Sequence, residues 1–429
     1  MRFSVEAPRP IIARTVVWSL LIGVLLVIYQ VACSVLISDR ATWSEAYRFM
    51  GGTYDANWYA VIVQGGYSTT KTFGNIASVA FMPGFPIAAH PVYWLLKTPL
   101  FSWLVSYPPQ ISLLVTAQVC AVVAWVYLIL IMRRFAVPPF LIGLSIVMIL
   151  AQPFSFIMVW GYSESLFLLA VMGFLYWYTK PEGLRNGLTI QAHALVASAS
   201  RMHGLALFTI PLFCGIIGAL HDSTWPERLR RLLYNGLLAL SAFSGAVIHF
   251  SYLYWKFGDW LLYFHSQMEG WGHQGIGLFG IFNWKIYRPW WRSFVSGYAE
   301  GNWVELSGII VPVFTVLCLL LFVGSLVLAR RKRPESISGS VVLFVYGMLY
   351  LTMVGVGKLH DFGFTVVGLS RYEFVMMFLL FPFLIIQVRA LFRPAFCYAI
   401  FGALGLLVIP LMLYHFYYLN LAVNHHIAL

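Results

Sequence analysis

Long runs of apolar residues, separated by short polar connections, dominate the chain. Runs of about 18 or more residues are typical of helices that cross a membrane. Such runs lie near residues 15–37, 109–132, 138–158, 237–255, 306–329, 338–356 and 395–417. Shorter runs, expected to form tilted or partial spans, lie near 163–178, 189–200, 204–220 and 374–388. The pattern predicts an all-α polytopic membrane protein, a single domain over residues 1–429 with about eleven transmembrane helices.

Composition agrees with this class and explains the positive net charge. Hydrophobic residues make up 61% of the chain and charged residues 10%, while the formal net charge is +12. The basic residues fall in short connections, at 133–134, 180–185, 228–231, 330–333 and 389–393, and in the N-terminal 14 residues. Short basic connections are typical of the cytoplasmic side. The charge therefore indicates topology rather than binding to nucleic acid, with the N-terminus cytoplasmic.

The same topology places two long connections on the outer face. These outer loops cover about residues 38–108 and 256–305, and the first has its own apolar stretch at 79–97. The second is rich in Trp, and aromatic amphipathic segments tend to lie in the plane of the membrane surface. Residues 51–59 are therefore expected outside and residues 330–333 inside. We expect function to reside on the outer face. The chain has no Asn-x-Ser/Thr acceptor, which is compatible with a bacterial plasma membrane.

Asp55 is the leading candidate for chemistry. It lies in the segment Gly-Gly-Thr-Tyr-Asp-Ala-Asn-Trp-Tyr, where Trp58 and Tyr59 could stack on a sugar. An ionisable residue beside a bilayer is costly, so it is a functional candidate by default. Two structural roles compete with this reading, because Asp55 could instead cap a helix or pair with Arg48.

Several stretches resemble one family when they are taken in order. The segments are 54–59, Gly66-Tyr67, 81–86 (Phe-Met-Pro-Gly-Phe-Pro), 160–165 (Trp-Gly-Tyr-Ser-Glu-Ser), 199–204 (Ala-Ser-Arg-Met-His-Gly) and 264–267 (Phe-His-Ser-Gln). Together they are similar to motifs of the PIG-V-type mannosyltransferases (GPI mannosyltransferase 2-like), which belong to the GT-C glycosyltransferase superfamily. One departure is Thr53-Tyr54, where family members often place Arg or Trp before the Asp.

The resemblance implies a GT-C-like helix bundle and an integral-membrane glycosyltransferase. It would transfer a sugar, mannose by analogy, from a polyprenyl-phosphate donor to a glycan, glycolipid or protein acceptor on the outer face. It also implies donor or substrate contacts for Glu164 and Gln267. No cofactor is expected beyond this lipid-linked donor, and membrane lipid is an expected partner.

Sugar transfer from a lipid phosphate requires few catalytic groups. A sugar on a lipid phosphate has a leaving group that departs without protonation, so one carboxylate suffices as general base on the acceptor hydroxyl. A glycosidase would need two carboxylates at a set separation. Asp55 fits the role of single base, with inversion at the anomeric carbon.

The lipid phosphate would need cations, and three of them are candidates: Arg201, Lys358 and Arg371. Arg201 separates two short apolar segments and could instead pair with Glu164. Arg371 opens an apolar helix and could instead pair with Asp361 or reach the interface.

A metal site is not expected. His265, Glu269 and His273 recur every four residues and could share a helix face, but neighbouring glycines argue against a regular helix there. The cysteines are scattered and form no Cys-x-x-Cys pair, which argues against a metal frame or a disulfide frame.

Two other functions remain open. A transporter or flippase also contains intramembrane charges such as Glu164 and Arg201. Against this, the chain shows no repeated half-pattern. An assembly subunit without chemistry of its own is the third possibility.

Overall fold

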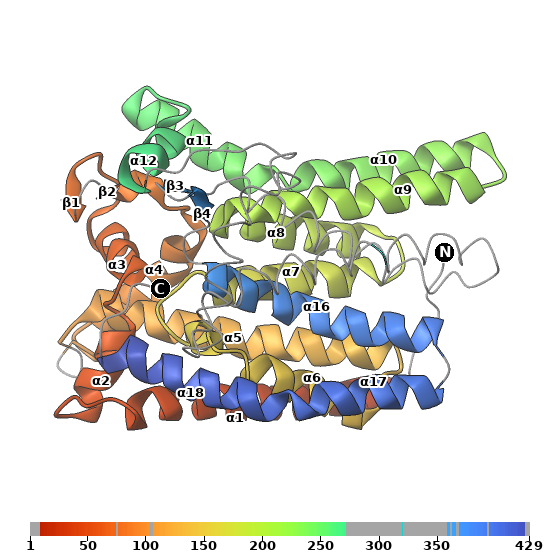
Figure 1. Cartoon of the computed structure of the whole chain (residues 1–429). Coiled ribbons are helices and arrows are strands. Elements are labelled where there is room, and N and C mark those ends of the chain that lie inside the picture. Colours follow the sequence, from red (N-terminus) through yellow and green to blue (C-terminus); the bar gives the residue numbers. More distant parts are fainter. Residues whose placement is uncertain are drawn as a thin grey trace.

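The computed structural model describes residues 9–73, 76–102, 106–271, 320, 358–360, 363–365, 369–392 and 394–424. These residues form an elongated bundle of helices, with two short antiparallel strand pairs at one end (Figure 1). The predicted runs at 306–329 and 338–356 lie outside the described residues, apart from residue 320. Most of the second outer loop, from residue 272 onward, also lies outside them.

The N-terminal two-thirds of the chain supplies most of the described helices. They are α1 (Arg9–Leu36), α2 (Trp43–Met50), α3 (Asp55–Gly65), α4 (Gly84–Lys97), α5 (Pro108–Arg134), α6 (Pro139–Leu150), α7 (Glu164–Tyr178), α8 (Leu184–Ser200), α9 (Thr209–His221), α10 (Trp225–Ser241), α11 (Ser244–Phe257) and α12 (Leu262–Trp271). Short 3₁₀ turns lie at η1 (Ser78–Ala80), η2 (Ser155–Met158) and η3 (Met202–Phe208).

The C-terminal part adds α16 (Leu369–Leu391), α17 (Pro394–Leu406) and α18 (Val408–Asn424). The strand pairs are β1 (Lys71–Phe73) with β2 (Ile76–Ala77), and β3 (Lys358–His360) with β4 (Gly363–Thr365). The protein is thus all-α in character, as the sequence predicts.

Four described helical segments are long and apolar enough to cross a membrane, or up to five if the bent pair α10–α11 counts as one span. They are Ala13–Leu36, Pro108–Arg134, Met202–Leu220 and Ala395–Asn424. Apolar helices of 10–17 residues lie at Pro139–Leu150, Glu164–Tyr178 and Phe374–Arg389. The class of membrane protein is confirmed, whereas a count of eleven spans is not.

Local breaks explain why some predicted runs are shorter in the structure. The run at 138–158 forms α6 only as far as Leu150, because Pro153 cannot continue a helix and disfavours helical backbone in the residue before it. The residues beyond it fold into η2. Prolines also mark helix starts, since α5 and α6 begin at Pro108 and Pro139, where the missing N–H has no helical partner to lose.

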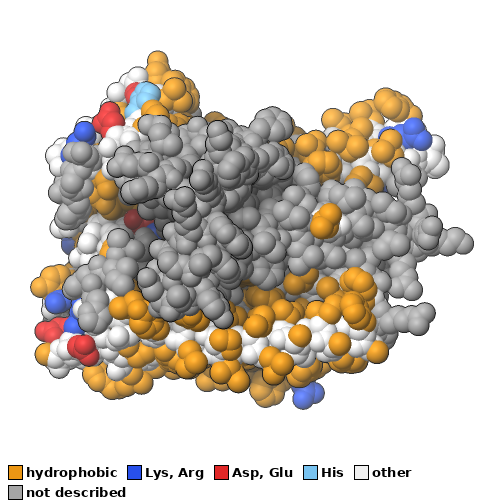
Figure 2. Space-filling model, in the orientation of Figure 1, with side chains coloured by type: hydrophobic (Ala, Val, Ile, Leu, Met, Phe, Trp, Pro, Cys, Tyr) orange, Lys and Arg blue, Asp and Glu red, His pale blue; other side chains and the backbone are white. Residues whose placement is uncertain are grey.

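The core lies where α5 and α7 pack together between α1 and α8. Trp125 of α5 is fully buried, and its ring centroid lies 4.8 Å from that of Phe378 in α16. Phe174 of α7 is also fully buried. Outward-facing Leu, Ile and Phe side chains are common, and apolar side chains cover much of the lower surface in Figure 2. An apolar exterior around an apolar core is expected of a bundle that lipid surrounds.

The two ends of the bundle differ. The loop joining α9 and α10 lies at the right in Figure 1, whereas α2, α3 and the β1–β2 pair lie at the left. Among the described residues, basic connections meet at the right-hand end. Arg134 donates to the carbonyl of Thr179 at 2.7 Å, and Arg389 donates to the carbonyl of Ala136 at 3.0 Å. Asp55 begins α3 at the opposite end. The described basic connections and Asp55 therefore lie at opposite ends of the bundle, and the orientation of the two ends in a membrane stays a prediction.

Candidate active site

The segments around Asp55 and Glu164 meet through close backbone contact. The N–H of Gly161 donates to the carbonyl of Met50 at 3.0 Å. A Cβ atom at Gly161 would lie 3.2 Å from the Cα of Gly51, so only a residue without a side chain allows this approach without a shift. The contact brings the first residue of α3 next to the first residue of α7.

Asp55 begins α3 and lies at the exposed edge of the site. Its side chain is 30% exposed, and its Oδ2 lies 2.5 Å from Nη1 of Arg371. The helix N-terminus adds partial positive charge near the carboxylate. Tyr54, directly before it, has a φ of 49°, a left-handed conformation that is unfavourable for a bulky residue and that tends to occur at functional sites. The alternative partner Arg48 instead lies over the Tyr107 ring, 4.2 Å from its centroid.

Glu164 lies at the buried centre of the cluster. It begins α7, and its side chain is 0% exposed. Its Oε1 accepts from Nε of Arg371 and lies 2.6 Å from Nη1 of Arg201. A buried carboxylate needs such partners, because an uncompensated charge in the interior is strongly destabilising. The ion pair between Arg201 and Glu164, which the sequence left open, is present.

Arg201 occupies the break between α8 and η3. Its backbone is extended, with a φ of −152°, and its side chain is 10% exposed. Besides Glu164, Arg201 donates to Oγ of Ser163 at 3.3 Å. The break is supported by Gly84, at the start of α4, where a Cβ would lie 2.8 Å from backbone atoms of Ala199 and Ser200. The motif at 81–86 therefore backs the segment that positions Arg201.

Aromatic side chains surround the four charges. The hydroxyl of Tyr59 donates to Oγ of Ser163 at 3.0 Å, and the guanidinium of Arg371 lies over the Tyr162 ring at 4.6 Å. The Trp58 ring stacks on Phe81 with centroids 5.7 Å apart. Trp58 and Tyr59 are each only 4% exposed. In this state the two side chains form the packed wall behind Asp55 rather than an open surface. Their predicted contact with a sugar stays a prediction.

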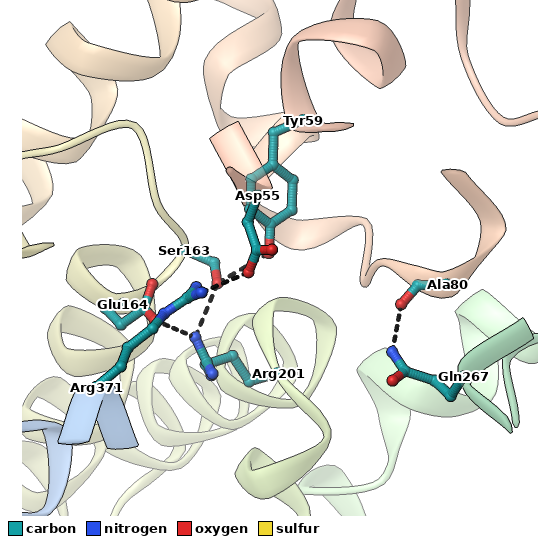
Figure 3. A network of polar contacts seen from close by, with 8 residues as sticks. All are labelled: Asp55, Tyr59, Ala80, Ser163, Glu164, Arg201, Gln267 and Arg371. Atoms are coloured by element: carbon teal, nitrogen blue, oxygen red, sulfur yellow. Dashed lines mark hydrogen bonds and ion pairs between the residues drawn. The ribbon is translucent and has the colours of Figure 1, made fainter. Parts of the chain in front are cut away.

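Figure 3 shows four of the predicted residues in one network: Asp55, Glu164, Arg201 and Arg371. Gln267 lies apart from that network, and its Nε2 donates to the carbonyl of Ala80 at 2.7 Å. On the same helix, Glu269 pairs with Lys71 at 3.1 Å. These contacts fasten α12 to the first outer loop. Substrate contact by Gln267 is not tested by this arrangement.

Two predicted partners fall outside what can be described. Lys358 lies in β3, which pairs with β4, but its side chain is not among the described ones. Asp361, the partner that the sequence suggested for Arg371, lies outside the described residues. The proposed donor contact of Lys358 therefore stays a prediction.

The possible metal ligands near α12 have other partners. Nδ1 of His265 lies 2.8 Å from Oδ2 of Asp259, and this hydrogen bond lowers the pKa of the Asp259 carboxyl below its usual value. Glu269 pairs with Lys71, and His273 lies outside the described residues. Within the described part of the chain, no three His, Cys, Asp or Glu side chains converge. The expectation of a metal-free site stays a prediction.

Two features of the site were not found from the sequence. The contact between Asp55 and Arg371 joins residues 316 positions apart, and no local pattern announces it. Ser163 accepts hydrogen bonds from both Tyr59 and Arg201. The sequence does not single it out, because a serine beside a glutamate is common at the start of a helix. The motif at 160–165 could have indicated Ser163 as a site residue, since it contains both Tyr162 and Ser163.

The arrangement carries two negative and two positive side chains and is therefore electrically balanced. Only the Asp55 carboxylate among them is substantially exposed. The site can thus present a carboxylate and, beneath it, a guanidinium to an incoming substrate.

No protein-family model matches the chain, and a search of curated proteins finds no significant match. The fold and site together define a helical membrane protein with a buried, balanced cluster of charges beneath Asp55.

Proposed function

We propose that the protein is an inverting glycosyltransferase of the membrane, which uses a polyprenyl-phosphate sugar as donor. The observation that carries the proposal is the position of Asp55. Its carboxylate is 30% exposed at the edge of a cluster whose other charges are at least nine-tenths buried, and an arginine lies directly beneath it. A base that substrate can reach, next to a fixed cation, is what this transfer requires.

In the proposed reaction, the acceptor hydroxyl oxygen attacks the anomeric carbon while its proton passes to Asp55. The bond between the anomeric carbon and the phosphate oxygen breaks, and both of its electrons remain on the phosphate. The products are the glycoside with inverted configuration and polyprenyl phosphate. No second acid is needed, because the phosphate leaves as an anion.

Arg371 would contact the general base first and the leaving phosphate afterwards. It contacts both Asp55 and Glu164 before substrate binds. As Asp55 takes up a proton its negative charge is lost, while the leaving phosphate gains one. A guanidinium offers several N–H donors in one plane, so it can turn from the carboxylate toward the phosphate. Arg201 would hold Glu164 in place meanwhile, through the ion pair at 2.6 Å.

The resemblance supports mannose as the sugar and the outer face as the site of transfer. The acceptor would be a glycan, a glycolipid or a protein. The end of the bundle that carries Asp55 lies opposite the described basic connections, which agrees with an extracytoplasmic site in a plasma membrane. The lack of an Asn-x-Ser/Thr acceptor is compatible with a bacterial membrane. No cofactor is needed besides the lipid-linked donor.

Replacing Arg371 tests donor recognition. We expect Arg371→Ala to raise the apparent KM for a polyprenyl-phosphate sugar at least about tenfold while changing the KM for acceptor much less, because charge-assisted contacts contribute about 1.5–3 kcal/mol. Arg371→Lys should recover only part of the donor affinity, since Lys offers a point charge and not a planar fork. Initial rates over a series of donor concentrations measure both effects.

Arg48→Ala is the matched control, because Arg48 is on the same side of the bundle but lies over Tyr107. It should leave donor affinity unchanged. If Arg371→Ala also left the donor affinity unchanged, Arg371 would not bind the phosphate of the donor. Arg201 or Lys358 would then be the better candidate for that contact.

A transporter or flippase is the second candidate, and one observation favours it. Glu164 and Arg201 form a buried ion pair within the bundle, as carriers often do. In a transporter, substitutions at Glu164 or Arg201 should abolish movement of substrate, while Asp55→Asn should be tolerated. In the glycosyltransferase, Asp55→Asn should insert normally and lose transfer.

The orientation can be tested with single cysteines at two exposed positions. Lys71 and Glu182 have similar side-chain exposure, 49% and 41%. Lys71 begins β1 and Glu182 lies in the connection from α7 to α8, and these two segments are at opposite ends of the bundle (Figure 1). In a cysteine-free background and intact cells, an impermeant thiol reagent should label Lys71→Cys and spare Glu182→Cys. Permeabilised cells, in which both should react, provide the control. Labelling of position 182 alone would reverse the topology.

A further inference from the structure

A groove opens between α1, α5 and α6, far from the candidate active site. Its volume is about 530 Å³, and Trp18, Ile22, Ile129, Ile142 and Ile146 line its walls. Small-molecule and cofactor sites have volumes of about 300–1,000 Å³ and similarly apolar walls. The segment before Asp55 approaches Gln110 near the start of α5, whereas Ile129 and Arg133 of the groove lie toward its end, so the two sites are at opposite ends of that helix.

Gly143 keeps one wall of the groove open. It lies within α6, lines the groove, and a Cβ added to it would meet no atom within 4 Å. Glycine in a helix interior costs stability relative to alanine, and no neighbouring atom requires a glycine here. The space beside it therefore stays available to a bound chain, and a larger side chain could fill it without a clash.

The groove has a cationic rim. Arg14 and Arg133 both line it, and both are exposed. Arg14 is the second residue of the candidate span Ala13–Leu36, and Arg133 is the last but one of Pro108–Arg134. The two arginines therefore lie where apolar helix surface gives way to the membrane interface. The N-terminus of α6, at Pro139, adds the positive end of a helix dipole. Among the residues that the structure describes, no acidic side chain lines the groove.

We propose that this groove binds one anionic phospholipid. The phosphate would lie between Arg14 and Arg133, and an acyl chain would extend along Trp18 and the isoleucines into the space beside Gly143. Charge complementarity decides the occupant, because a rim with two arginines and no acidic residue among its described lining favours a lipid with net negative charge over a zwitterionic one. Basic pockets between membrane helices are recognised sites for acidic lipid headgroups. The proposal does not depend on sugar transfer.

The charge of the headgroup is tested by native mass spectrometry of the purified full chain. Phosphatidylglycerol and phosphatidylcholine are titrated separately into detergent micelles that hold the protein. We expect one phosphatidylglycerol to bind at least about tenfold more tightly than phosphatidylcholine. Arg14→Gln and Arg133→Gln should each weaken phosphatidylglycerol binding about fivefold, and the double variant should lose the preference. Arg230→Gln, at an exposed arginine of α10, is the control and should change nothing.

The shape of the groove is tested with Gly143→Phe, which fills the space without removing charge. This variant should lose the tightly bound lipid while keeping the thermal stability of the wild type. Gly402→Phe is the matched control, because Gly402 is an exposed glycine of α17 that also has open space and does not line the groove. Equal binding of both lipids by the wild type, or full retention of phosphatidylglycerol in Gly143→Phe, would overturn the proposal.

Discussion

Asp55→Asn should lower the turnover of sugar transfer by at least about a hundredfold, while the protein inserts and folds as the wild type does. The amide keeps the shape of the side chain but cannot take the acceptor proton, and general-base catalysis contributes about 10²–10⁴-fold. The amide oxygen of Asn can still accept a hydrogen bond from Arg371, which also keeps its contact with Glu164, so neither buried guanidinium loses all of its partners. Turnover measured at saturating donor and acceptor reports the effect.

Asp39→Asn is the matched control for this experiment. Asp39 is an exposed carboxylate of the same outer loop, and its backbone N–H donates to Asn424 at 2.9 Å. This variant should transfer sugar at the wild-type rate. If Asp55→Asn stayed within a few fold of the wild type, Asp55 would not be the base. Glu164 would then be the next candidate, although it is 0% exposed and would first have to become accessible.

Glu164→Gln should produce the largest loss of stability, about 3–5 kcal/mol in the free energy of unfolding. The substitution removes the carboxylate that pairs with both Arg201 and Arg371. Asp55 is then the one carboxylate left in the cluster for the two buried guanidiniums, and it contacts Arg371. Denaturant unfolding of the purified protein in detergent measures this change. The double variant Glu164→Gln/Arg201→Gln restores the balance of charge and should lose less than the two single variants summed.

Glu182→Gln supplies the comparison for Glu164→Gln. Glu182 also faces an arginine, Arg231, at 3.6 Å, but its side chain is 41% exposed. Exposed ion pairs contribute about 0–1 kcal/mol, so this variant should be nearly neutral. Similar effects at positions 164 and 182 would contradict the assignment of Glu164 as the buried centre of the site.

The helical elements could be predicted because apolar runs report burial in lipid or core directly. The runs near 15–37 and 109–132 correspond to α1 and α5. Runs that contain a break were harder, since hydropathy does not register the effect of Pro153 on α6 or of Arg201 on α8. The membrane class follows from the sequence, whereas the number of spans depends on these local backbone effects.

The sequence indicates which charged residues belong to the site, but it does not indicate which of them form ion pairs with one another. Asp55, Glu164, Arg201 and Arg371 are unusual charges in an apolar chain, and unusual charges attract a functional interpretation. Sequence reasoning looks for partners nearby, and it therefore offered Arg48 for Asp55 and Asp361 for Arg371. The structure instead brings Arg371 to Asp55 across 316 positions, because α16 packs against α5 and α7. Tertiary packing of this kind leaves no local pattern.

The most direct test of the glycosyltransferase account is transfer itself. Purified protein in liposomes is incubated with polyprenyl-phosphate sugars radiolabelled in the sugar, mannose first, and with membrane extract as acceptor. We predict that label leaves the lipid donor and appears in a glycoside of inverted configuration, with one polyprenyl phosphate released for each sugar, and that Asp55→Asn abolishes this. If the labelled donor crosses the bilayer intact and no glycoside forms with any sugar of the panel, the protein is a carrier and the account is wrong.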